Sequence, residues 1–216
     1  QKDTQQEFLD NISHELKTPL MSIQGYAEGI KDGIFPADEQ TLGIITDESI
    51  RLKKLVGEIS YLSKLESMPD FYNKTKVEVS GIIQKSLDSV SGLEQARDIK
   101  IMKLNLIECI LMGDESKLHQ LMINILSNSI RYSEKTVFID TTIKDNKYII
   151  TVKDDGIGFT PGEEHKIFRR FYKGQGGNTG LGLSIAMAIA MNHGGTIKSW
   201  NAVPHGAVFE ISLDIL

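Results

Sequence analysis

Residues 118–132 read Leu118-His119-Gln120-Leu121-Met122-Ile123-Asn124-Ile125-Leu126-Ser127-Asn128-Ser129-Ile130-Arg131-Tyr132. Apolar residues recur here every three or four positions, which predicts one buried stripe on a helix. This stripe consists of Leu118, Leu121, Met122 and Ile125. Asn124, Asn128 and Arg131 form a second, polar stripe. Asparagine is disfavoured inside helices because its side chain competes for backbone hydrogen bonds, so two asparagines one turn apart indicate a specific task.

The amide oxygens of Asn124 and Asn128 are hard donors that suit Mg²⁺. This cation takes few protein ligands and leaves its other positions to water and nucleotide phosphates, so one or two asparagines are enough. An ordinary solvent-facing polar stripe explains the same two residues equally well when this helix is considered alone.

The hydrophobic pattern on either side of this helix changes period repeatedly and predicts a mixed domain. The expected helices lie near residues 80–96 and 181–192, and the expected strands near 99–104, 108–112, 136–143, 147–154, 196–201 and 207–213. Helices combined with mostly antiparallel strands predict an α+β sandwich.

Two helical patterns precede this domain, near residues 8–30 and 42–65. Asp32-Gly33-Ile34-Phe35-Pro36 separates them, with a glycine to end one helix and a proline to open the next, so we expect an antiparallel hairpin. Pairing of two hairpins would give a dimeric four-helix bundle, and packing against the rest of the same chain is the alternative. We expect domains at 1–67 and 74–216 with a linker at 68–73.

The first helix carries His14, followed by Glu15, Thr18 and Pro19. His14 lies beside the apolar stripe, so its imidazole should face solvent as a nucleophile, with Glu15 as a proton acceptor. Thr18 shares its helix face at i+4, and Pro19 should bend the helix there. Taken alone, a surface polar pair explains His14 and Glu15 better. The run does not read HExxH, so zinc protease chemistry is not indicated.

Two glycine-rich segments precede the last helix pattern. Lys153-Asp154-Asp155-Gly156-Ile157-Gly158-Phe159 ends a strand, and Asp154 there could accept a hydrogen bond from the amine of a base. Gly174 to Ser184 leads into the helix, whose free N–H groups could meet phosphates. The alternative for the first segment is an ordinary Asp-Gly turn. The alternative for the second is a flexible loop. Neither segment matches the Walker or Rossmann fingerprint.

Composition excludes several protein classes. The chain has 216 residues and a net charge of -5, and the negative charge argues against a protein whose main function is nucleic-acid binding. Its single cysteine, Cys109, fits a reducing, cytoplasmic setting. No apolar run is long enough to span a bilayer, and the start at Gln1 predicts a piece of a longer protein.

Five segments in order resemble the conserved boxes of the sensor histidine kinases. They are His14 to Pro19 (phosphoacceptor box), Asn124 to Tyr132 (asparagine box), Asp154 to Gly158 (first glycine box), Ile167 to Tyr172 (phenylalanine box) and Thr179 to Leu183 (second glycine box). The resemblance implies a dimerisation and phosphotransfer domain followed by a Bergerat-type (GHKL) ATP-binding domain. It also implies autophosphorylation from ATP and Mg²⁺, transfer to an aspartate of a response regulator, and a full-length protein in the bacterial cell membrane.

Site residues follow from the same resemblance. His14 would receive the γ-phosphoryl group, Glu15 would act as general base, and Thr18 would support dephosphorylation of the partner. Asn128 would hold Mg²⁺ beside Asn124. The further ATP-binding residues would be Arg131, Tyr132, Asp154, Gly156, Ile157, Gly158, Thr179, Gly180, Leu181 and Gly182. Residues 159–179 would form a mobile lid.

The chain departs from the family pattern at Ser129, Arg131 and Asp155, where alanine, lysine and asparagine are common. These departures leave ATP affinity open and motivate one alternative, a catalytically weak pseudokinase that serves as a dimeric docking scaffold. A serine kinase of the same superfamily is a second alternative, but it leaves His14 without a purpose.

Overall fold

The structure is a computed structural model that describes residues 2–174 and 179–215. It divides the chain into two compact units, Gln1–Ser63 and Lys64–Leu216. The first unit is helical, and the second combines helices with two sheets. None of the helices in the described ranges is long and apolar enough to cross a lipid bilayer.

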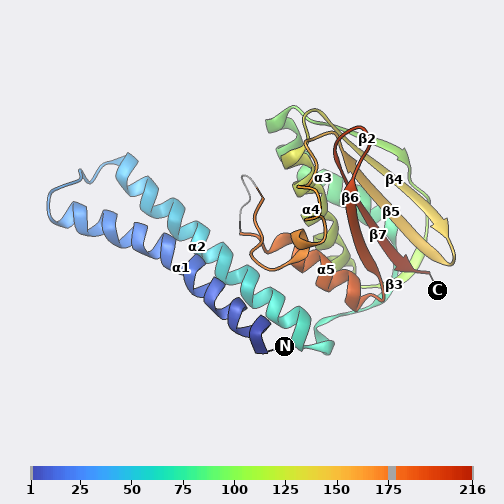
Figure 1. The fold of residues 1–216 in the computed structure, drawn as a ribbon, viewed down its shortest axis with the longest axis horizontal. Helices are drawn as coiled ribbons and strands as arrows, with labels where there is room; N and C mark the ends of the chain where they lie inside the picture. The colour runs from blue at the N-terminus through green and yellow to red at the C-terminus, as the bar shows by residue number, and fades with distance from the viewer. Residues whose placement is uncertain (1, 175–178, 216) are drawn as a thin grey trace. The chain divides into compact units, whose positions relative to one another are not determined.

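The predicted helical hairpin is confirmed. It consists of α1 (Lys2–Lys31) and α2 (Glu39–Ser67), drawn in blue to cyan in Figure 1. Gly33 follows α1 with φ +72°, a left-handed conformation that glycine adopts without steric cost. Asp38, rather than Pro36, opens α2, because the Asp38 Oδ1 accepts the Thr41 backbone N–H at 2.8 Å.

Several large apolar side chains of the hairpin remain exposed. They are Leu9, Leu20, Met21, Leu42, Ile50 and Val56. Exposed apolar area of this extent favours burial against a second hairpin over a solvated surface. The dimeric four-helix bundle stays a prediction.

Two sheets form the β structure of the second unit. β1 (Thr75–Glu78) and β3 (Ile110–Gly113) pair antiparallel. The larger sheet has the order β2-β4-β5-β7-β6. Its strands are β2 (Lys100–Asn105), β4 (Thr136–Lys144), β5 (Lys147–Asp154), β6 (Thr196–Asn201) and β7 (Ala207–Asp214). Only β2 and β4 pair in parallel; the other neighbours are antiparallel.

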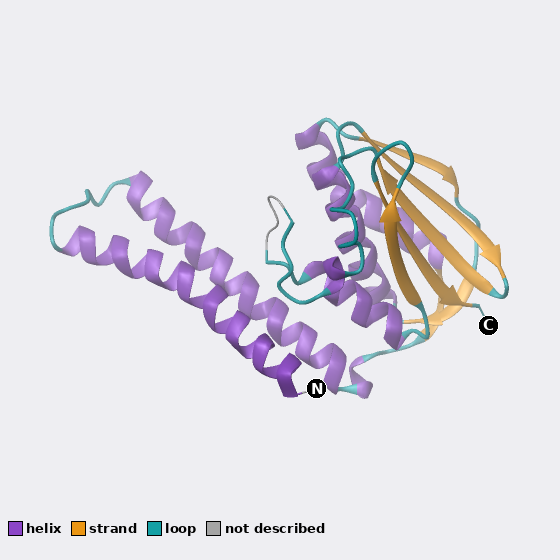
Figure 2. Ribbon diagram, viewed as in Figure 1, coloured by secondary structure: helices purple, strands orange, loops and turns teal. Residues whose placement is uncertain are grey.

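Helices cover one face of the larger sheet, as Figure 2 shows. They are α3 (Val79–Arg97), α4 (Glu115–Tyr132) and α5 (Gly182–Asn192). Alternate residues of β5 are buried, which is the pattern of a sheet with one covered face. On the helical side, α4 packs between α3 and α5, and its residues Leu121 and Ile125 are almost fully buried. The predicted α+β sandwich is confirmed.

One short strand has no counterpart in the sequence pattern. β1 reads Thr75-Lys76-Val77-Glu78, and only Val77 in it is apolar and buried. A single apolar residue cannot produce a detectable alternation, so the strand exists because β3 pairs with it.

Residues 71–74, which we call the docking segment, are held by contacts with α4 and α5 and their caps within the second unit. The Asn73 N–H donates to Asp114 Oδ2 at 2.9 Å, and Lys74 Nζ donates to the Asn192 carbonyl. Lys117 Nζ lies 3.8 Å from the centroid of the Phe71 ring. A 3-10 turn, Pro69–Phe71, leads into the segment. The predicted domain limits and the linker at 68–73 stay a prediction, and residues 69–73 of that linker include this turn and two of these contacts.

Candidate active site

The polar stripe of α4 faces the beginning of α5. Asn124 Nδ2 donates to the Gly182 carbonyl at 2.9 Å, and Asn124 Oδ1 accepts a hydrogen bond from Gln120 Nε2 at 3.0 Å. The side-chain amide of Asn128, one turn further on, makes no hydrogen bond with any residue that the structure describes. The two asparagines therefore differ, because only Asn128 has an uncommitted amide oxygen.

An amide oxygen of this kind fits Mg²⁺. The described residues contain no cluster of three His, Cys, Asp or Glu side chains that could hold a metal ion. A magnesium ion at Asn128 would take its other ligands from water and nucleotide phosphates, which is the arrangement this cation prefers.

Asp154 ends β5 as a buried carboxylate with one unused oxygen. Its Oδ1 accepts the backbone N–H groups of Gly156 and Ala207, both at 3.0 Å. Its Oδ2 is buried and has no partner among the described residues. Burial raises the pKa of Asp154 above its ordinary value, and the two N–H groups offset part of that effect. An unpaired buried acceptor is costly, so Oδ2 is suited to a ligand that brings an N–H donor, such as the adenine amine.

Glycines keep this part of the site narrow. A Cβ at Gly156 would lie 1.9 Å from the Tyr132 carbonyl oxygen, and one at Gly206 would lie 2.0 Å from the Asp154 carbonyl oxygen. Neither position has room for a side chain, because both neighbours are backbone atoms. The end of α4, the end of β5 and the β6–β7 connection consequently meet at one point.

Asp155 holds that junction together, a role that the sequence analysis did not predict. Its Oδ1 accepts the N–H groups of Glu134 and Lys135 at 2.9 and 3.0 Å, and its Oδ2 accepts that of Thr136 at 2.9 Å. Burial alone would raise the pKa of Asp155, but these hydrogen bonds outweigh it and lower the pKa. The only signal in the sequence was an acidic residue at a position where the family often has asparagine.

The second glycine segment begins α5. Gly180 has φ +71°, and its carbonyl accepts the Phe171 N–H at 2.9 Å. Leu181, the N-cap residue of α5, is buried and offers no side-chain cap, and Thr179 is half-buried. The N–H groups of the first turn of α5 are therefore not satisfied by a capping side chain, which suits an anion.

The predicted lid is described only in part. Residues 175–178 of it lie outside the described residues. In the remainder, Tyr172 Oη donates to Glu163 Oε2 at 2.9 Å, and Lys166 Nζ lies 3.0 Å from Glu163 Oε1. The rings of Phe159 and Phe168 pack edge-on against Phe209 of β7. These contacts tie the segment to the sheet, and its mobility stays a prediction.

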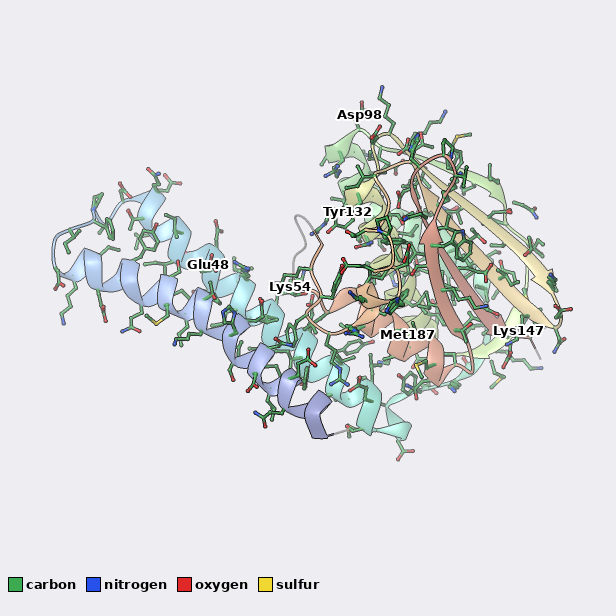
Figure 3. The ribbon with its side chains drawn as sticks, viewed as in Figure 1. Glu48, Lys54, Asp98, Tyr132, Lys147 and Met187 are labelled. Carbon is green, nitrogen blue, oxygen red and sulfur yellow. The ribbon has the colours of Figure 1, made fainter. Side chains whose placement is uncertain are left out.

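The remaining predicted ATP residues lie close to the same junction. Arg131 and Tyr132 are half-buried at the end of α4, and Figure 3 labels Tyr132 there. Ile157 is 75% exposed. Gly158 has φ +76°, and a Cβ there would lie 2.5 Å from Asn201 Oδ1. The glycine requirement at 158 is thus set by backbone conformation and by Asn201.

His14, Glu15 and Thr18 lie together on α1 in the first unit. His14 and Thr18 are exposed, and Glu15 is half-buried. Thr18 Oγ1 donates to the His14 carbonyl at 3.3 Å, so the hydroxyl lies on the helix face of His14. The helix continues across Pro19, which is buried, and the predicted bend stays a prediction.

Comparison with known families agrees with this geometry. Residues 4–67 match the His Kinase A (phospho-acceptor) domain, and residues 113–216 match the histidine kinase-, DNA gyrase B-, and HSP90-like ATPase family. The chain belongs to the histidine kinases. Its two units correspond to the two parts of a histidine kinase catalytic core, and the Bergerat-type fold of the second part is confirmed.

Relatives of this kinase core include sensor proteins and solved kinases. The sensor histidine kinase CssS of Bacillus subtilis is 37% identical over 207 residues, covering 93% of this chain and 45% of CssS. The solved histidine kinase AdeS of Acinetobacter baumannii has a TM-score of 0.79 at 26% identity, covering 94% of this chain and 98% of that chain. The histidine kinase ThkA, solved with the response regulator protein TrrA, has a TM-score of 0.79 at 24% identity over 97% of this chain and 61% of that chain, a likeness of fold. The chain spans less than half the length of the curated relatives it matches.

Proposed function

We propose that this histidine kinase core transfers the γ-phosphoryl group of ATP to His14 and then to an aspartate of a response regulator. One observation carries the proposal: the same chain holds an exposed histidine on a phosphoacceptor helix and a buried site whose Asp154 Oδ2 lacks a hydrogen-bond donor within the described residues. An imidazole nitrogen of His14 forms the new bond to phosphorus, the bond to the β–γ bridging oxygen breaks, and ADP leaves. Glu15 accepts the proton from the other nitrogen.

The geometry of the second unit supports a set of ATP contacts. Asp154 Oδ2 accepts the adenine amine, and Tyr132 lies beside the base. Arg131 and the start of α5, residues 179–182, face the phosphates. Asn128 holds Mg²⁺, which when bound neutralises charge on the phosphates.

Asn124 favours transfer over hydrolysis. Water-activating ATPases of this superfamily carry a glutamate at this position, whereas an amide cannot take a proton from water. Here the amide is also engaged on both sides, by Gln120 and by Gly182. A bound water is therefore poorly activated, and the imidazole of His14 is the better nucleophile.

Partner and location complete the proposal. The kinase acts as a homodimer through the exposed apolar residues of the hairpin, and the response regulator docks through its receiver domain; ThkA, a kinase of the same fold, was solved with such a partner. Thr18 supports dephosphorylation of that regulator. The core works in the cytoplasm, and the full-length protein is anchored in the bacterial membrane by other segments.

The test is incubation with γ-labelled ATP and Mg²⁺, comparing the wild type with His14→Gln. His119→Gln is the matched control, because His119 pairs with Ser89 Oγ on α3 at 3.1 Å and has no place in the reaction. Acid-labile label that is lost only in His14→Gln supports the proposal. Nucleotide binding without any label contradicts it and favours the scaffold alternative.

A further inference from the structure

Gln120 has no role in the proposed reaction, yet it lies at the start of a short chain of hydrogen bonds that ends at the second glycine segment. Gln120 Nε2 donates to Asn124 Oδ1 at 3.0 Å, and Asn124 Nδ2 donates to the Gly182 carbonyl at 2.9 Å. Both glutamine and asparagine are half-buried on α4, and Gly182 is the first residue of α5. The chain therefore joins the middle of one helix to the beginning of another.

The direction of each hydrogen bond is determined by chemistry. The Gly182 carbonyl can only accept, so the NH₂ group of Asn124 must face it and Asn124 Oδ1 must face the opposite way. Gln120 supplies the donor that this oxygen needs. In the flipped orientation, two oxygens would face each other at Gly182 and two NH₂ groups would face each other at Gln120. The Gly182 carbonyl thus sets the orientation of the Asn124 amide, and Gln120 holds that amide in place by donating to the oxygen that faces away from Gly182.

The orientation matters because the Asn124 amide contacts Gly182, the first residue of α5. Its N-cap residue, Leu181, provides no side-chain hydrogen bond. A Cβ on Gly182 would lie 3.8 Å from Asn124 Oδ1, so the asparagine is in van der Waals range of the helix start. The Asn124 side chain therefore links α4 directly to Gly182 by a hydrogen bond.

We propose that Gln120 is a positioning residue for phosphoryl transfer: through Asn124 it sets the start of α5 against the phosphates, without touching nucleotide or metal. The inference rests on the proposed function, in which residues 179–182 face the phosphates. It also gives the two asparagines different roles: Asn124 links two helices, and Asn128 is the metal ligand.

The experiment compares three variants of the full chain. Gln120→Met removes the donor at nearly constant shape, and Gln120→Glu places an acceptor opposite Asn124 Oδ1. Gln84→Met is the matched control, because Gln84 Nε2 donates to Asp88 Oδ1 at 2.9 Å with the same i to i+4 spacing on α3. The measurements are the affinity for a non-hydrolysable ATP analogue, the rate of His14 labelling at saturating ATP, and the side-chain amide NMR signal of Asn124.

We expect Gln120→Met to lower the labelling rate at saturating ATP by about fivefold to tenfold, the size of one lost hydrogen bond, and to shift the Asn124 amide signal. Gln120→Glu should be worse, and Gln84→Met should match the wild type. In an Asn124→Ala background Gln120→Met should have no further effect. Equal behaviour of Gln120→Met and Gln84→Met would overturn the inference, as would an undiminished effect in the Asn124→Ala background. A wild type that binds nucleotide without labelling His14 would instead refute the proposed function, and the Asn124 signal and the analogue affinity would still decide on Gln120.

Discussion

Replacement of Asp155 by alanine is expected to loosen the junction between α4 and β4. The carboxylate accepts three backbone N–H groups, from Glu134, Lys135 and Thr136, at 2.9 to 3.0 Å. Hydrogen bonds to a charged acceptor contribute about 1.5–3 kcal/mol each, which would sum to about 5–9 kcal/mol. Glu134 and Lys135 are exposed, so water replaces the carboxylate there, and only Thr136 is half-buried. We therefore expect a loss of about 2–3 kcal/mol.

Asp155→Asn should cost less, about 1–2 kcal/mol, because its remaining oxygen can keep the hydrogen bonds to Glu134 and Lys135. The new NH₂ group would face the Thr136 N–H. The pKa of Asp155 is lowered in the folded state, so its contribution is complete above the ordinary aspartate pKa of about 4 and is lost as pH falls below that value. The difference between wild type and Asp155→Asn should shrink accordingly at acid pH.

Denaturant unfolding followed by tryptophan fluorescence measures this effect, because Trp200 is the single tryptophan and lies in the second unit. Hydrogen exchange of the three amides gives a local measure. Asp140→Ala is the control, since Asp140 is half-buried on β4 and accepts no side-chain hydrogen bond among the described residues. If Asp155→Ala unfolded within about 0.5 kcal/mol of Asp140→Ala, and the amides exchanged at unchanged rates, the reasoning would be refuted.

Three further predictions concern other residues. His193 Nε2 accepts the Asp114 N–H at 3.0 Å, and burial lowers the His193 pKa, opposed by the Ile189 carbonyl; stability should fall as pH drops below the ordinary histidine value of about 6.5, and a His193→Gln variant with the same pH slope in its melting temperature would contradict this. Asn128→Ala should reduce His14 labelling by at least about 100-fold through loss of the metal ligand, whereas near-normal labelling would remove Asn128 from that role. Thr18→Ala should keep autophosphorylation and lose dephosphorylation of the regulator, which a phosphatase assay on phosphorylated regulator checks.

Long periodic elements were predictable from sequence because their period is strong. The helix predicted from Ser116 to about Arg131 shows this best: its apolar stripe is buried, and its polar stripe reaches the site. The place of Asp154 at the end of a strand was also predictable, and its role in binding adenine stays a prediction.

What sequence could not predict depends on long-range contacts. Asp155 has backbone partners about twenty residues away, and Gly206 is required only because it approaches the Asp154 carbonyl. Residues 68–73 look like a linker because their proline and polar residues carry no periodicity, and the partners of the docking segment belong to α4 and α5 and their caps. Gln120 looks like one more polar residue on a helix until the orientation of Asn124 is known.

The docking segment is attached to the ends of α4 and α5 that lie farthest along each helix from Asn128 and Gly182. Asn73 binds the cap of α4 at Asp114, and Asp114 in turn binds His193 at the end of α5. Helices α4 and α5 are thus linked by hydrogen bonds at two places, one at His193 and the other at Asn124. Any ligand whose affinity depended on the tilt of α4 and α5 would, by thermodynamic reciprocity, change the stability of the docking-segment contacts by the same free energy.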